Sequence, residues 1–254
     1  MPVMAGLIGT TWIALWLWEQ SPYGRYLDHG RWTDIGPAAF MCAALPAGTV
    51  LLPALLYVGG WLLMSVAMML PTTLPLLNIF RRMIDARPDR VRLLALLIAG
   101  YILTWAAFGV GAHVIDALLH RAVRSLDWLA LNGWAIGALV LALAGLFQFS
   151  RLKYHCLDKC RTPLGFVSYH WGGRTPLRDA FRLGLHHGAY CVGCCWALML
   201  LMFVVGTGSV GWMLALGAVM ALEKNVSWGH LISRKLGYGL LAWAAAVVFL
   251  NVSA

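Results

Sequence analysis

The chain has 254 residues, of which 61% are hydrophobic and only 11% are charged. In soluble domains, roughly a quarter of all residues are charged. So few polar side chains cannot cover a water-soluble globule of this size, and the composition also excludes a disordered chain and a collagen-like repeat. The formal net charge is +9, from 19 Lys and Arg against 10 Asp and Glu.

Long apolar segments predict a helical membrane protein, because about 20 apolar residues cross the hydrocarbon core as an α-helix. Residues 35–80 alone contain no Asp, Glu, Lys or Arg. Residues 36–53 are apolar but broken by proline and glycine, which leaves open whether they span the membrane, re-enter it or lie at its interface. We expect about seven spanning helices, over residues 3–18, 54–79, 93–118, 133–150, 182–206, 209–223 and 236–251.

The positive charges indicate an orientation in the membrane. Most of the 19 Lys and Arg fall in three alternate connections, at about residues 81–92, 151–182 and 224–235. Cytoplasmic loops of membrane proteins carry an excess of these residues. The sequence therefore predicts a multi-pass protein of the cell (inner) membrane with a cytoplasmic N-terminus and an external C-terminus, and no nucleic-acid partner.

The chain shows no internal repeat and no low-complexity linker. We therefore expect residues 1–254 to form a single integral membrane domain. The predicted fold class is all-α, a polytopic transmembrane bundle with a cytoplasmic loop that is rich in Arg and Lys and contains cysteine.

Five of the six cysteines fall in two groups. Cys156 and Cys160 lie in the long inner loop, and Cys191, Cys194 and Cys195 lie in the span that follows it. Because the cytoplasm keeps thiols reduced, metal ligation or thiol exchange is favoured over a structural disulfide.

Helical periodicity places the span cysteines on one face. At about 100° per residue, Cys191, Cys194 and Cys195 share a stripe with His187 and Met202. Such a stripe is costly against lipid but provides soft metal ligands towards another helix. The predicted metal ligands are Cys156, Cys160, His187, Cys191, Cys194 and Cys195.

Further donors accompany this set. His155 precedes the loop cysteines, and Met64 and Met68 lie one helical turn apart near the same inner face, so that these residues and Met202 are additional candidate ligands. Thioethers and thiolates favour Cu(I), while Zn(II) or an iron-sulfur cluster remain alternatives.

A second polar group lies near the external side. His113, Asp116 and His120 follow one another at positions i, i+3 and i+7 of the third predicted span. Two imidazoles and a carboxylate on one helix face suggest a second, outer metal site, with solvated or paired charges at a helix end as the alternative.

Several motifs resemble a known family over about residues 54–229. They are Ala67-Met68-Met69-Leu70-Pro71-Thr72, the Cys156 to Pro163 segment, the Gly184 to Met199 segment, and Glu223-Lys224. These features are similar to those of the bacterial predicted metal-binding integral membrane proteins, a family of unknown function. The resemblance implies that this chain binds a metal.

Three functions are consistent with these patterns. The first is a membrane protein that handles or delivers a soft transition metal, copper before others, and exchanges it with a metal-donor or metal-acceptor protein. The second is a thiol-disulfide or metal-centre oxidoreductase. The third is an accessory subunit of a larger membrane complex with a structural zinc. The sequence shows no nucleotide-binding or hydrolase motif, so it identifies no catalytic residue and leaves enzymatic activity open.

Overall fold

The structure is a computed structural model that describes residues 2–21, 51–205 and 209–253. Over these residues it contains helices and no strand, which confirms the all-α prediction. Most of the apolar segment 36–53 lies outside the described residues. The helices are α1 (Pro2–Glu19), α2 (Leu51–Met69), the short 3-10 helix η3 (Pro71–Thr73), α3 (Leu74–Met83), α4 (Arg90–Ser125), α5 (Asp127–Leu131), α6 (Trp134–Phe147), α7 (Arg151–Arg161), α8 (Pro163–His170), α9 (Pro176–Val205), α10 (Val210–Asn225) and α11 (Gly229–Val252).

Three of the described helices, α4, α9 and α11, are long and apolar enough to cross a membrane. The number rises to five if each of two bent pairs is one span: α2 with η3 and α3, bent by 42°, and α6 with α7, bent by 62°. The predicted count of about seven spans is thus not confirmed. One reason is that α10 has 16 residues, which rise only about 24 Å, short of the roughly 30 Å of a hydrocarbon core.

Local sequence explains both bends. Pro71 and Pro75 occupy the first turns of η3 and α3, where a missing backbone N–H does no harm, but neither residue can continue the helix before it. Ser150 begins α7 as its N-cap, since its hydroxyl accepts a hydrogen bond of 3.1 Å from the backbone N of Lys153. The loop predicted between the fourth and fifth spans is therefore largely the two helices α7 and α8.

The long helices α4 and α9 pack side by side through glycine. A Cβ atom on Gly184 would collide with the backbone oxygen of Leu97, and one on Gly188 would lie 2.8 Å from the side chain of Thr104. These two glycines form the GxxxG spacing that permits close helix approach in membranes. The contact fixes α9, which carries the candidate site, against α4.

We expect Gly184→Ala to lower stability by about 1–3 kcal/mol, because a backbone oxygen cannot move aside as a side chain could. The matched control is Gly111→Ala in α4, where nothing lies within 4 Å of the added Cβ. Thermal unfolding of the purified proteins in detergent, followed by circular dichroism, measures the difference. Equal midpoints for the two variants would show that the helices are not held at this contact.

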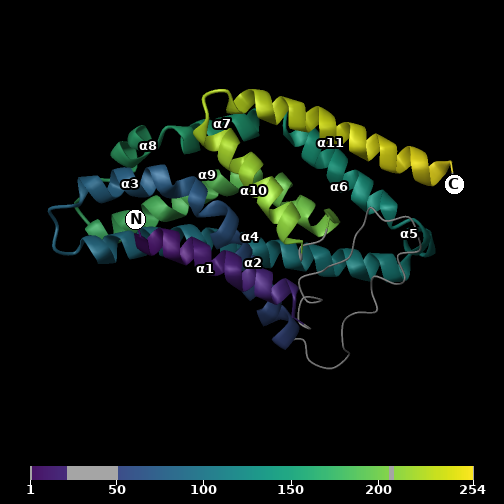
Figure 1. Ribbon diagram of the computed structural model, residues 1–254, viewed down its shortest axis with the longest axis horizontal. Coiled ribbons are helices and arrows are strands. Elements are labelled where there is room, and N and C mark those ends of the chain that lie inside the picture. The colour runs from purple at the N-terminus through teal and green to yellow at the C-terminus, as the bar shows by residue number, and fades with distance from the viewer. Residues whose placement is uncertain (1, 22–50, 206–208, 254) are drawn as a thin grey trace.

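The basic connections lie towards one end of the molecule. Figure 1 shows the end of α3, the whole of α8 and the turn between α10 and α11 away from the C-terminus and from α5. This arrangement is compatible with basic loops on one side of a membrane.

Candidate functional site

Helix α9 carries the predicted ligand stripe into the protein interior. The helix begins at Pro176. The hydroxyl of Thr175, just before the helix, donates a hydrogen bond of 2.8 Å to the carboxylate of Asp179 in its first turn. Along the helix, the side chains of His187, Cys191, Cys194, Cys195 and Met202 are all buried, with at most 3% of any of them exposed.

The three thiols of α9 lie within one turn of each other. The Sγ atoms of Cys194 and Cys195 donate to the backbone oxygen of Cys191, at 3.1 and 2.8 Å. The Sγ of Cys195 also lies 3.7 Å from the Sδ of Met69 at the end of α2. A thioether thus joins the thiols, and it belongs to a methionine that the sequence analysis did not single out as a ligand.

The loop cysteines meet the helix cysteines, because α7 packs against α9. The side chains of Cys160 and Cys194 lie close enough for their thiols to interact electrostatically. Cys156 lies over Gly193, where an added Cβ would be only 2.6 Å from its Sγ. We name Cys160, Cys191, Cys194 and Cys195, with Met69, the thiol cluster.

Residue Cys160 is partly exposed, whereas the other members of the thiol cluster are buried. The cluster therefore lies nearest the surface at its α7 side.

A buried lysine lies beside the thiol cluster. The Nζ of Lys224, at the end of α10, is 2.9 Å from the Sγ of Cys191, 3.1 Å from the Oγ1 of Thr72 and 3.9 Å from the Sδ of Met69. On another side the hydroxyl of Tyr101 lies 3.1 Å from the same Sγ. Neither residue was predicted as part of the site, although Lys224 is a charge at the end of an apolar segment of the sequence.

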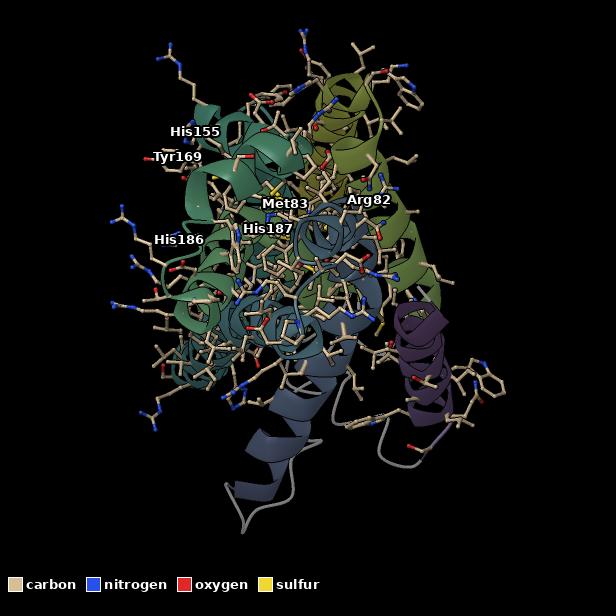
Figure 2. All side chains as sticks on the ribbon, turned by 90° about the vertical axis from the view of Figure 1, so that its left-hand side faces the viewer. Arg82, Met83, His155, Tyr169, His186 and His187 are labelled. Carbon is tan, nitrogen blue, oxygen red and sulfur yellow. The ribbon has the colours of Figure 1, made fainter. Side chains whose placement is uncertain are left out.

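His187 extends the polar surface one turn before Cys191. Its ring stacks on Tyr101 at 5.9 Å between centroids and meets Phe166 edge-on at 5.5 Å. Its buried Nδ1 has no hydrogen-bond partner among the residues that the structure describes, which is unusual for a buried polar atom and leaves a nitrogen that could bind a metal. Figure 2 shows His187 inside the bundle and His155 at its outside.

The remaining candidate ligands are placed less closely. His155 is exposed, with its ring 6.2 Å from that of Tyr190. Met64 and Met68 are both buried, and Met68 lies against Gly217 of α10.

In the predicted outer site, His113 and Asp116 lie one turn apart on α4, but the side chain of His120 is outside the described part of the structure.

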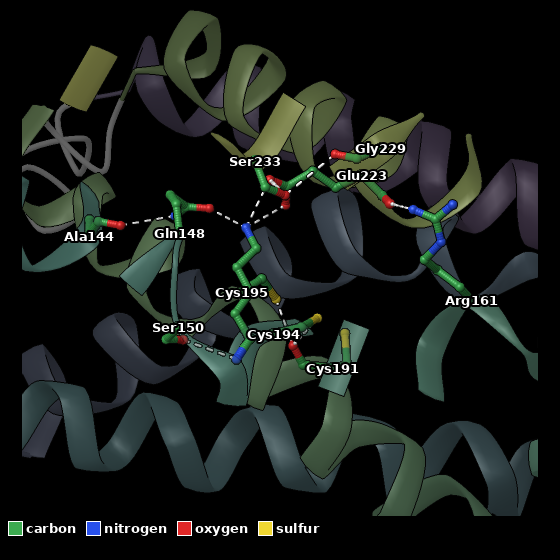
Figure 3. A network of polar contacts seen from close by, with 11 residues as sticks. Ala144, Gln148, Ser150, Arg161, Cys191, Cys194, Cys195, Glu223, Gly229 and Ser233 are labelled. Carbon is green, nitrogen blue, oxygen red and sulfur yellow. Dashed lines mark hydrogen bonds and ion pairs between the residues drawn. The ribbon is translucent and has the colours of Figure 1, made fainter. Parts of the chain in front are cut away.

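A buried ion pair adjoins the site and joins four helices or their ends. The Nζ of Lys153 in α7 lies 2.8 and 2.9 Å from the two carboxylate oxygens of Glu223 in α10 and also donates to the Oε1 of Gln148. Ser233 of α11 donates to the same carboxylate at 2.7 Å (Figure 3). Arg161 closes the group from outside by donating to the backbone oxygen of Glu223 at 3.0 Å. This network holds α7, and with it Cys156 and Cys160, against α10 and α11.

The described residues do not show the ligand grouping of a tetrahedral metal site. Within the described residues, no three or more His, Cys, Asp or Glu side chains are grouped to hold one metal ion. Structural Zn(II) sites have four ligands, whereas thiolate and thioether ligands favour Cu(I).

A family model for the copper chaperone PpoB2 matches residues 58–247, which is most of the chain and includes every member of the thiol cluster. The chain belongs to the PpoB2 copper chaperone family. The match supports the resemblance to a metal-related family, and the description of the matched family specifies copper. No curated protein and no solved structure matches the chain.

Proposed function

We propose that this member of the PpoB2 family binds Cu(I) as cargo in the thiol cluster and delivers it to an acceptor protein. The observation that carries the proposal is the meeting of Cys160 from α7 with Cys194 of α9 in a buried group that also contains a thioether. Soft sulfur ligands of this kind select Cu(I) over harder ions.

The proposed route of the ion begins at α7. Cys160 and Cys156 capture the ion, and thiolate exchange passes it on among Cys191, Cys194 and Cys195, two thiolates holding it at a time. His187 offers an imidazole one turn further along α9. Met64, Met68 and Met202 serve as weak ligands for release, and His155 as an outer contact.

The proposed setting is the cell (inner) membrane, with about seven spans, the basic connections and the thiol cluster at the cytoplasmic face, and the C-terminus outside. His113, Asp116 and His120 form a second site at the opposite face in this arrangement. The alternatives, an oxidoreductase and an accessory subunit with structural zinc, gain no support from the family match.

Metal analysis of the purified chain tests the proposal. After the protein is reconstituted with Cu(I) under reducing conditions, we expect about one tightly bound copper ion per chain. X-ray absorption should show sulfur atoms as the ligands of this ion. The control is Cys42→Ser, the same substitution at the cysteine that stands apart in the sequence, which should leave copper binding unchanged. Copper that is absent, or bound only by nitrogen and oxygen, would contradict the proposal.

A further inference from the structure

Lys224 is a buried cation whose three contacts are all acceptors. Only 6% of its side chain is exposed. Its Nζ reaches the sulfur of Cys191, the hydroxyl of Thr72 and the sulfur of Met69. An ammonium group has three N–H donors and no acceptor, so these three contacts use its full donor capacity.

No carboxylate balances this charge within the described part of the chain. The ion pairs found there do not include Lys224. The neighbouring Glu223 is turned to Lys153 instead, with both its oxygens within 2.9 Å of that Nζ. Because an unpaired buried charge is costly, the thiol cluster is the group that must supply the compensating negative charge.

We propose that Lys224 makes the thiol cluster selective for a monovalent over a divalent soft metal ion, an inference that rests on the proposed function. Two thiolates with a monovalent ion carry one net negative charge, which the ammonium of Lys224 balances. Two thiolates with a divalent ion are already neutral, so that Lys224 is left as an uncompensated buried cation. The divalent complex is therefore penalised by the same lysine that stabilises the monovalent one.

The charge count depends on two thiolates per ion. The described residues hold no group of three side chains from His, Cys, Asp and Glu around one ion position. The additional sulfur beside Cys195 is the thioether of Met69, which is neutral. A third thiolate would reverse the preference, because the divalent complex would then be the one that Lys224 balances.

Ag(I) and Cd(II) separate charge from softness, since both prefer sulfur ligands but differ by one unit of charge. Dissociation constants for each ion are measured by competition titration on the full chain in detergent, for the wild type, Lys224→Met and Lys224→Gln. Lys235→Met is the matched control, because it removes the same charge from an exposed position of α11. Lys224→Gln keeps a donor for Thr72 and provides the second neutral variant if Lys224→Met does not fold.

We expect the wild type to prefer Ag(I), and the preference over Cd(II) to fall at least about tenfold in both Lys224 variants while Lys235→Met retains it. A wild type that binds both ions equally well, or a preference unchanged or increased in the Lys224 variants, overturns the inference but leaves the proposed function intact. A wild type that binds neither ion overturns both.

Discussion

Replacing Glu223 by glutamine is expected to destabilise the protein by about 3–5 kcal/mol. The substitution preserves size but leaves the ammonium of Lys153, whose side chain is fully buried, without a counter-charge. Removing one partner of a buried ion pair is costly because the remaining charge cannot return to water. Thermal unfolding of the purified protein in detergent, followed by circular dichroism, measures the loss.

Two controls isolate the effect of burial. Asp85→Asn breaks the exposed pair between Arg90 and Asp85, whose atoms lie 2.9 Å apart, and should leave the midpoint unchanged because solvent screens exposed pairs. The double variant Lys153→Met with Glu223→Leu removes both buried charges, and we expect it to recover much of the lost stability. Equal midpoints for Glu223→Gln and Asp85→Asn would mean that the buried pair does not hold α7 in place.

The sequence could predict the features of the site that depend on one helix. The positions of Cys191, Cys194 and Cys195 follow from a helical period that needs no partner. Their burial follows from the cost of placing polar side chains against lipid, and the structure buries all three.

The parts of the site that arise from distant segments could not be predicted. Tyr101 and Met69 reach the cluster only because α4 and α2 pack around α9, and no local pattern encodes which residue of each helix lies at that level. Helical spacing predicts Met64 and Met68 as ligands, but the structure places Met69 next to a thiol. Spacing identifies a helix face, and the packing partner decides which methionine on or beside that face contacts the cysteines.

The positions of the helices could be predicted from the sequence better than the number of membrane spans. Hydropathy located the segments, but α2 with α3 and α6 with α7 are bent pairs rather than straight spans. The bends come from local sequence features, which are Pro71 and Pro75 in one pair and the Ser150 N-cap in the other. A hydropathy profile is averaged over a window of residues and does not show such features.

The contact between Cys160 and Cys194 leads to the prediction with the largest effect on copper. If the two thiols share one ion, Cys160→Ser and Cys194→Ser should each weaken Cu(I) binding by more than the roughly 10–100-fold that loss of a supporting neighbour costs at a metal site. A hydroxyl is a far weaker ligand for Cu(I) than a thiolate. Competition titration with a Cu(I) chelator under reducing conditions measures both constants.

The double variant decides whether the site is shared. Once one ligand of a common site is lost, losing the second removes little more, so Cys160→Ser with Cys194→Ser should bind Cu(I) about as weakly as either single variant. Two separate sites would instead give losses that multiply or a second, unaffected copper ion. Cys42→Ser, measured alongside, shows what loss of the cysteine that stands apart in the sequence does. Because Cys160 approaches from α7 and Cys194 from α9, non-additive losses would establish that copper joins the two helices in one site.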